Sequence, residues 1–229
     1  MKIVTNKKLI RRNARIGQVT SLSALVVLGV GMYVSLKRPE LFGLSIGALI
    51  VGFILSQVGM FFGNRWGRSP RPDEKLDSGL KGLPGDYTLY HYVTPATHLL
   101  VGPAGVWLLM AYYQSGTITY TRGRFRQRGG GFVQGYLRIF GQENIGRPDL
   151  ESAAEVDAVR RYLHKQTEGE LPPIRTALVF LNEKAELQTE GAPFLALPIK
   201  KLKDFIRKQA KEQPLAAKDI ERLKAVLPQ

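Results

Sequence analysis

Two long stretches of this 229-residue chain contain no charged side chain, and they limit its fold more than any other feature. Residues 16–36 form a run of 21, and residues 41–63 form a run of 23. At a rise of about 1.5 Å per residue, either run can cross a hydrocarbon core of about 30 Å as a helix. The short link between them contains Pro39, which disfavours one continuous helix. The sequence therefore predicts a transmembrane hairpin over residues 16–63.

The basic residues around the two spans predict their orientation. Six of them and no acid precede the first span, namely Lys2, Lys7, Lys8, Arg11, Arg12 and Arg15. Four more follow the second span closely: Arg65, Arg68, Arg71 and Lys75. The link between the spans carries only Lys37 and Arg38 as basic residues. By the positive-inside rule, we expect an integral, multi-pass membrane protein with both termini in the cytoplasm.

A cleaved signal peptide is the competing interpretation of the first span. It is disfavoured because a second span follows directly and no small-x-small cleavage site ends a short apolar region. Two glycine pairs, at positions 43 and 47 and at positions 59 and 63, are spaced for close helix packing. Glycine is common in membrane helices, however, and we adopt that simpler interpretation of both pairs.

Composition agrees with this layout. The net charge of +14 is partly topological, because residues from Asn64 onward carry 25 Lys and Arg against 18 Asp and Glu, a net of +7. We therefore expect a moderately basic cytoplasmic domain. The chain has no cysteine, which excludes disulfides and thiolate catalysis and suits a reducing compartment.

The predicted organisation has four parts. A basic cytoplasmic N-terminus covers residues 1–15, the hairpin residues 16–63, a juxtamembrane linker residues 64–75, and one cytoplasmic domain residues 76–229. Helices are expected at 73–83, 149–166, 199–211 and 216–227, and strands at 87–93, 98–101, 106–112, 117–127, 174–180, 185–187 and 194–198. This order predicts an α/β fold, with a mixed sheet covered by helices on both faces.

One segment of the domain carries a family resemblance. It contains Thr97-His98, the turn Gly102-Pro103-Ala104-Gly105-Val106, Leu109-Met110-Ala111-Tyr112 and Gly116. This pattern resembles the nuclease-related domain (NERD) family, a branch of the PD-(D/E)XK restriction-endonuclease-like superfamily. The resemblance covers roughly residues 73–227 and includes the later stretches ALVFLNEKAEL and IKKLKDFIR. It implies a restriction-endonuclease-like mixed sheet flanked by helices.

The catalytic motif of that family is degenerate in this chain. Members carry an Asp where this chain has Thr97, a Glu where it has Met110, and a Lys where it has Tyr112. A thioether and neutral hydroxyls are poor Mg²⁺ ligands, so the family's metal-assisted chemistry cannot run through these three residues. We expect no cofactor. The resemblance also implies an early helical Glu. Asp73 or Glu74 could fill that position, and Glu74 is the candidate for a surviving acid.

Arginines alternate in a second segment of the domain. Arg122, Arg124, Arg126 and Arg128 are spaced two residues apart, so on one strand they would form a row about 20 Å long on a single face. Such a row can follow a phosphate backbone or anionic lipid headgroups. A charged edge strand that only resists aggregation is an equally good interpretation.

Three functions remain open at this point. The first is a membrane-anchored, catalytically inactive module that binds nucleic acid, anionic lipid or a protein partner. The second is an active Mg²⁺-dependent nuclease that uses displaced acids, with Glu74, Asp77, Glu143 and Asp149 as candidates. The third is a structural cytoplasmic domain of a membrane complex. His91 is expected to be a structural histidine, and His98 at most to line the degenerate site.

Overall fold

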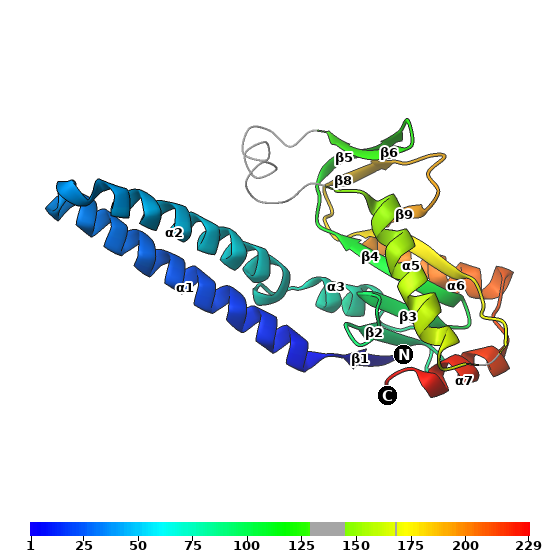
Figure 1. The fold of residues 1–229 in the computed structure, drawn as a ribbon. Coiled ribbons are helices and arrows are strands. Elements are labelled where there is room, and N and C mark those ends of the chain that lie inside the picture. Colours follow the sequence, from blue (N-terminus) through cyan, green and yellow to red (C-terminus); the bar gives the residue numbers. More distant parts are fainter. Residues whose placement is uncertain (129–144, 168) are drawn as a thin grey trace. The chain divides into compact units, whose positions relative to one another are not determined.

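A computed structural model describes residues 1–128, 145–167 and 169–229 (Figure 1). The described chain divides into two compact units. Residues 7–71 form one unit, and residues 1–6 together with residues 72–229 form the other. The unit of residues 7–71 is called the hairpin unit below, and the other unit is called the domain.

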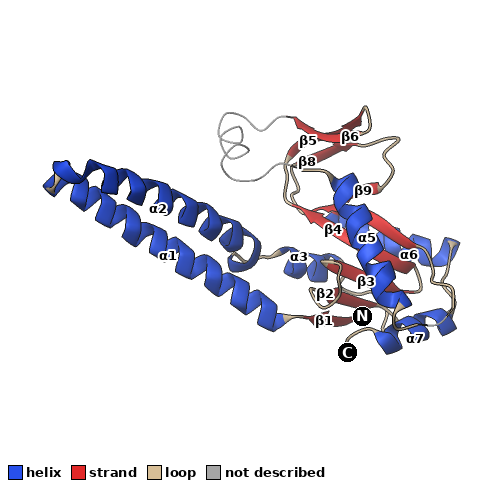
Figure 2. Cartoon of the chain, in the orientation of Figure 1, coloured by secondary structure: helices blue, strands red, loops and turns tan. Residues whose placement is uncertain are grey.

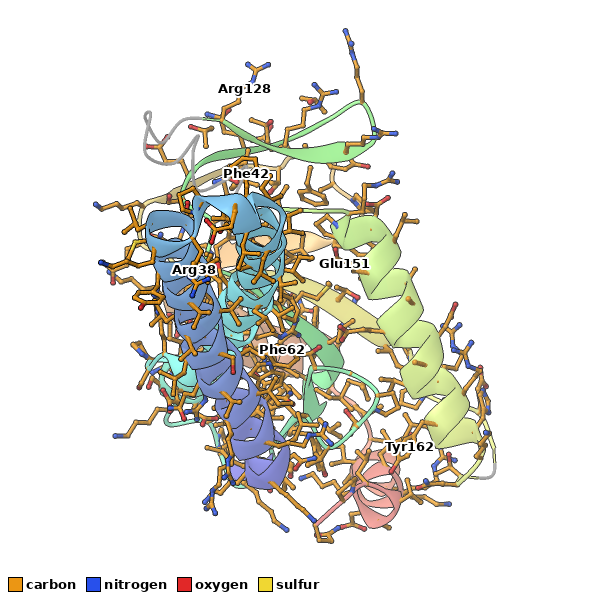
Figure 3. The ribbon with its side chains drawn as sticks, turned by 60° about the vertical axis from the view of Figure 1, so that its left-hand side comes forward. Arg38, Phe42, Phe62, Arg128, Glu151 and Tyr162 are labelled. Carbon is orange, nitrogen blue, oxygen red and sulfur yellow. The ribbon has the colours of Figure 1, made fainter. Side chains whose placement is uncertain are left out.

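The hairpin unit consists of two long helices. Helix α1 covers Lys7–Lys37 and helix α2 covers Phe42–Phe62, with the 3-10 turn η1 at Pro39–Leu41 and the π-helical turn η2 at Gly63–Gly67. Both helices are long and apolar enough to cross a membrane, and only 11% of the apolar window of each is buried. A core helix of a soluble protein would be mostly buried. Large apolar side chains, Phe42 among them, are exposed along the helices (Figure 3).

Small residues form the seam between α1 and α2. The buried positions recur every seven residues, at Gly17, Ala24 and Gly31 on α1 and at Ser45, Gly52 and Gly59 on α2. A Cβ added to Gly52 would lie 2.6 Å from the Leu28 side chain, so the backbones approach closely here. A Cβ added to Gly43 or Gly47 would meet nothing within 4 Å, so the simpler interpretation holds for the first glycine pair. In the second pair, Gly59 packs against Ser21, and the Gly63 nitrogen lies 2.9 Å from a Cβ built on Gly17.

The domain contains a six-stranded sheet and a three-stranded sheet. The larger sheet has the order β1-β2-β3-β4-β7-β9, and the smaller one has the order β6-β5-β8. The strands of the larger sheet are β1 at Lys2–Thr5, β2 at Thr88–His91, β3 at His98–Gly102, β4 at Gly105–Tyr112, β7 at Ile174–Phe180 and β9 at Leu195–Pro198. Strand β3 pairs antiparallel with both β2 and β4. The other pairings are parallel: β1 with β2, β4 with β7, and β7 with β9.

Helices cover both faces of the larger sheet, as the sequence predicts (Figure 2). These helices are α3 at Pro72–Gly79, α5 at Pro148–His164, α6 at Ile199–Glu212 and α7 at Ala217–Val226. One core cluster joins the sheet to α5 and α7 through Val159, Leu163 and Leu223. The opposite cluster joins it to α3 and α6 through Leu76, Leu80 and Leu202. The mixed α/β architecture is thus confirmed.

Two segments differ from the sequence-based expectation. The sequence predicts a basic tail over residues 1–15, but residues 2–5 form β1 inside the domain and residues 7–15 begin α1. The single strand expected at 117–127 is a hairpin of β5 at Gly116–Thr121 and β6 at Arg124–Arg128. The remaining strand of the smaller sheet is β8 at Ala185–Gln188.

Candidate functional site

The three residues at which the sequence predicts a degenerate motif lie at the ends of β3 and β4. Thr97 directly precedes β3, while Met110 and Tyr112 occupy alternate positions near the end of β4. Met110 and Tyr112 are both 8% exposed and both belong to the core cluster under α5. They therefore share one face of the strand, as their spacing predicts. We call Thr97, Met110 and Tyr112 the vestigial positions, after the lost catalytic site that the family resemblance predicts there.

Helix α5 places two carboxylates at these vestigial positions. The backbone N–H of Thr97 donates to Glu155 Oε2 at 3.0 Å, and the Thr97 hydroxyl donates to Glu155 Oε1 at 2.9 Å. The Tyr112 hydroxyl donates to Glu151 Oε2 at 3.3 Å. Residues four apart share one face of a helix, which explains why Glu151 and Glu155 reach the same region. Sequence analysis did not single out either glutamate, because each is one acid among several on an amphipathic helix.

Electrostatics keep this region neutral or negative. Burial raises the pKa of Tyr112 strongly, and the nearby Glu151 carboxylate raises it further. Tyr112 therefore stays protonated and acts as a hydrogen-bond donor. In the absence of a metal, two carboxylates repel a phosphate group. The vestigial positions are thus a poor place for a bare polyanion to bind.

Among the described acids proposed as displaced ligands, Asp149 lies near the vestigial positions, where its charge helps to raise the pKa of Tyr112. Glu74 and Asp77 lie on α3, which covers the opposite face of the sheet. Asp149 lies at the start of α5, and a hydrogen bond from Arg147 lowers the pKa of its carboxyl. Glu143 lies outside the described residues. Within the described residues, no three His, Asp or Glu side chains come together so that they could hold a metal ion.

The two expected histidines form a buried chain on the α3 side of the sheet. His91 Nε2 lies 3.0 Å from Asp77 Oδ1, and His91 Nδ1 lies 2.7 Å from His98 Nδ1. Both rings are buried. His91 is thus a hydrogen-bonded core histidine, as expected. The expectation that His98 lines the vestigial positions comes from its place beside Thr97. In the structure its ring instead packs toward His91 and α3, on the other face of the sheet.

The arginine row is divided by a turn. Arg122 and Gly123 both have positive φ, 52° and 73°, as in the type I′ turn that joins two antiparallel strands. Arg122 therefore lies in the turn, and the prediction that all four arginines share one strand is wrong. The other three lie on β6 opposite threonines of β5, with Arg124 paired to Thr121, Arg126 to Thr119 and Arg128 to Thr117.

Arg124, Arg126 and Arg128 share one exposed side of the small sheet, which we call the arginine face. Their Cα atoms span about 13 Å along the strand. The alternate residue Phe125 is buried in the core on the other side, together with Ile118. Within the part of the chain that the structure describes, no carboxylate pairs with these three guanidiniums. Figure 3 shows Arg128 on β6 and Glu151 on α5.

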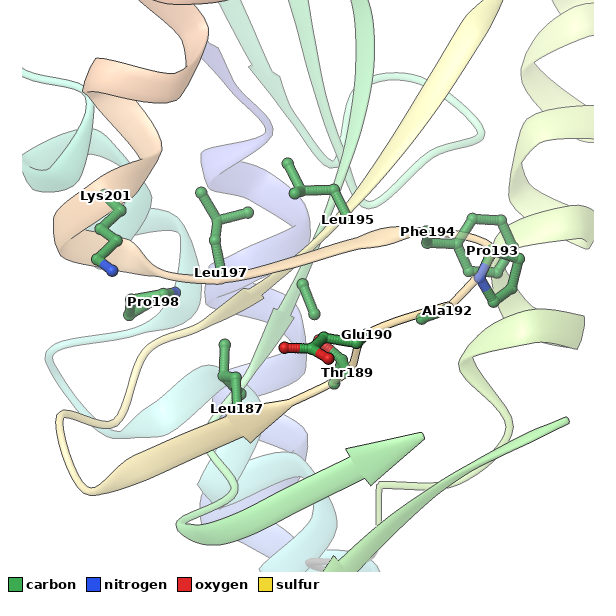
Figure 4. Close-up of a pocket in the computed structure, with 11 residues that line it drawn as sticks. Leu187, Thr189, Glu190, Ala192, Pro193, Phe194, Leu195, Leu197, Pro198 and Lys201 are labelled. Carbon is green, nitrogen blue, oxygen red and sulfur yellow. The ribbon is translucent and has the colours of Figure 1, made fainter. Parts of the chain in front are cut away.

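A shallow hollow of about 590 Å³ opens beside β8 and β9 (Figure 4). Its lining is mostly apolar, with Glu190 and Lys201 as the charged side chains. The arginine face and the vestigial positions contribute none of the described lining residues. We therefore take the arginine face as the candidate binding site. Comparisons with models of protein families, with curated proteins and with solved structures find no match to this chain.

Proposed function

We propose that this protein is a membrane-anchored, catalytically inactive, nuclease-related module that binds polyanions through its arginine face. The ligand class is the phosphodiester group, carried either by nucleic acid or by anionic lipid. The arginine face is the observation that carries this proposal. Three guanidiniums without carboxylate partners among the described residues, held at a regular spacing on a strand, offer charge-assisted hydrogen bonds to successive phosphates.

The turn at the end of the arginine face supports this proposal. Arg122 adopts the left-handed conformation, which costs an L-residue about 1 to 2 kcal/mol and suits Asn or Gly better. A strained residue that keeps a cationic side chain at the tip of a hairpin is a sign that the charge is used. Arg122 extends the positive surface beyond the three strand arginines.

Recognition would depend on phosphate rather than on bases. The aromatic side chains of the hairpin, Tyr120 and Phe125, pack against the core on the side away from the arginines. They are therefore not placed to stack with bases. Contacts from guanidiniums to phosphates carry little sequence information, so we expect binding that depends strongly on salt and weakly on sequence.

The membrane anchor in this proposal is the hairpin of α1 and α2. The basic residues before α1 and after α2 support a cytoplasmic location for both termini. The inactive state is supported by the residues at the vestigial positions, which supply a thioether and two hydroxyls in place of acids and a lysine. Both hydroxyls there donate hydrogen bonds to α5.

The test uses the full chain in nanodiscs of zwitterionic lipid. Replacing Arg124, Arg126 and Arg128 by Gln should weaken binding to duplex DNA and reduce the slope of log affinity against log salt, by up to about 0.9 per lost contact. A matched control replaces three exposed lysines of α6 and α7 by Gln, at Lys201, Lys211 and Lys218. If the arginine variant binds duplex DNA as the parent does but binds anionic vesicles more weakly, the ligand is anionic lipid. If its affinity for both ligands is unchanged, the arginine face is only a solvated edge strand, and the partner is a protein.

The alternative function is a metal-dependent nuclease built on Glu151 and Glu155. The observation that favours it is the position of both carboxylates beside the vestigial positions. We expect the full chain to cleave neither DNA nor RNA with Mg²⁺ or Mn²⁺. Cleavage that disappears in both Glu151→Gln and Glu155→Gln, and persists in Asp157→Asn on the same helix, would establish the alternative.

A further inference from the structure

The first residues of the chain belong to the domain although the hairpin unit separates them from it in sequence. Strand β1 pairs in parallel with β2, with Lys2 opposite Thr88 and Thr5 opposite His91. The Lys2 N–H donates to Tyr87 O at 2.8 Å, and the Asn6 N–H donates to His91 O at 3.0 Å. Hydrogen bonds therefore hold β1 at both of its ends.

Side chains of this segment also contact the domain. Val4 packs against the core cluster under α5, and Met1 packs against the opposite cluster. Asn6 Nδ2 donates to the carbonyl of Tyr92 at 3.2 Å. Tyr92 has a positive φ of 59°, which is rare for a bulky residue and needs support from its surroundings. Residues 1–6 thus complete the sheet and support a strained turn next to it.

Parallel strands need a crossover connection, and here residues 6–87 provide it, with the hairpin unit and α3 inside the connection. The chain leaves the domain after Asn6 and returns to it at Pro72. If α1 and α2 cross a membrane, both ends of the hairpin must therefore emerge on the side where the domain folds. A chain whose α1 inserts the other way would place β1 across the membrane from β2.

We infer that residues 1–6 act as a topology lock, an intramolecular strand addition that completes the domain only when residues 7–71 have inserted as a hairpin. This inference rests on the membrane anchor of the proposed function but not on its polyanion ligand. The edge of β2 is the acceptor site, and the occupant is the N-terminal segment of the same chain. Without that segment, β2 presents an unpaired edge, the kind of edge that promotes aggregation.

A disulfide test addresses the pairing directly. The chain has no cysteine, so Lys2→Cys with Thr88→Cys introduces the only thiols. These paired positions lie on neighbouring strands about 4.8 Å apart, within the range that a disulfide spans. The full chain in isolated native membranes should form an intramolecular disulfide when a thiol oxidant such as diamide is added. Absence of the cross-link, or a cross-link between two chains that each carry one of the cysteines, would overturn the lock.

A pair of proline variants tests whether the backbone pairing matters. The Lys2 and Asn6 N–H groups point to β2, so the two-residue repeat of a strand points the Val4 N–H to β2 and the Ile3 N–H away from it. Val4→Pro should therefore abolish the cross-link. It should also make the thiol introduced by Thr88→Cys react with a maleimide about tenfold faster, because the loss of a ladder hydrogen bond frees the edge. Ile3→Pro should leave both measurements unchanged, and equal behaviour of the two variants would contradict the inference.

Two further measurements separate failure of the lock from failure of the proposed function. Labelling of Glu40→Cys by a reagent that cannot cross the membrane reports whether the link between α1 and α2 is outside. Duplex DNA binding by Val4→Pro reports on the arginine face, which belongs to the other sheet. A missing cross-link with intact DNA binding rejects only the lock, and an intact cross-link without anion binding rejects only the polyanion ligand.

Discussion

Arg122 is a charged residue in a backbone conformation that is unfavourable for arginine, in the turn that it forms with Gly123. Both residues have positive φ, and Asn-Gly is the sequence best suited to this type of turn. Arg122 is exposed, so packing does not explain the choice of arginine. Its charge at the hairpin tip is the property that an uncharged turn residue would lack.

Replacing Arg122 by Asn should stabilise the hairpin, because Asn tolerates the left-handed conformation better. We expect a gain of about 1 kcal/mol and a higher melting temperature of the full chain in detergent. Arg124→Asn removes the same charge from an extended strand position and should give no such gain. A gain for both variants would mean that charge repulsion, rather than backbone strain, is relieved.

Tyr112 links β4 to α5 through its hydrogen bond to Glu151. Tyr112→Phe should lower the free energy of unfolding by about 1 kcal/mol at neutral pH, measured by denaturant titration. The folded pKa of Tyr112 is raised above its ordinary value of about 10. The stability contributed by the neutral phenol is therefore complete below pH 10 and is lost as the pH rises above it.

This titration gives the Tyr112→Phe variant a second signature. Tyr87 and Tyr90 also have a raised pKa, and they are present in both proteins. The difference between parent and variant should therefore shrink above about pH 10, where only the parent can ionise at position 112. A difference that stays constant up to about pH 11 would show that Tyr112 is not buried as described.

Helices α1 and α2, which are long and apolar enough to cross a membrane, pack through a seven-residue repeat of small residues. A repeat of this period keeps one stripe of each helix facing its partner. The helices run antiparallel, with Gly17 against Phe62, Leu28 against Gly52, and Gly31 against Ala48. The more familiar four-residue spacing of glycines does not describe this seam, because a Cβ added at Gly43 or Gly47 would meet nothing within 4 Å, whereas the Gly63 backbone lies against Gly17.

Two alanine variants distinguish these spacings. A Cβ at Gly59 would lie 2.9 Å from the Ser21 backbone nitrogen and 3.1 Å from its Cα, so Gly59→Ala should push the helices apart and lower the melting temperature in detergent. Gly47→Ala meets nothing within 4 Å and gains helix propensity. It should leave the melting temperature unchanged or raise it. Equal effects at the two positions would contradict the seam.

At the scale of the whole molecule, the domain is discontinuous in sequence. Residues 1–6 and 72–229 form one compact unit, and the hairpin unit is an insertion between its first two strands. A cut at the end of the hairpin would therefore remove an edge strand of the larger sheet. The domain therefore cannot be equated with the residues that follow α2.

This arrangement predicts the behaviour of two soluble fragments. Joining Asn6 to Pro72 by a flexible Gly/Ser linker should give a monomeric, cooperatively unfolding domain, because it keeps β1. Residues 72–229 alone should aggregate or melt at a lower temperature, since β2 then has an unpaired edge. Size-exclusion chromatography and thermal melting compare the two fragments. Equal stability would show that β1 contributes little to the fold.

Local periodicity was enough to predict several features of the fold. Charge-free runs of sufficient length predicted α1 and α2, and the two-residue alternation correctly placed Met110 and Tyr112 on one face of β4. The positions of the domain helices and of most strands along the chain followed from the same kind of pattern. These predictions succeed because hydrophobic burial depends on which side of an element each residue occupies.

Tertiary structure decided the features that depend on contacts between distant residues. The turn between β5 and β6 has two residues, Arg122 and Gly123, so the alternation of side chains continues through it without a break. For this reason the sequence predicts one strand where the structure has a hairpin. The reach of Glu151 and Glu155 to Tyr112 and Thr97 depends on how α5 crosses the sheet. The pairing of β1 with β2 joins residues more than eighty positions apart. No local pattern encodes such a pairing, since it forms only where the rest of the fold leaves a strand edge open.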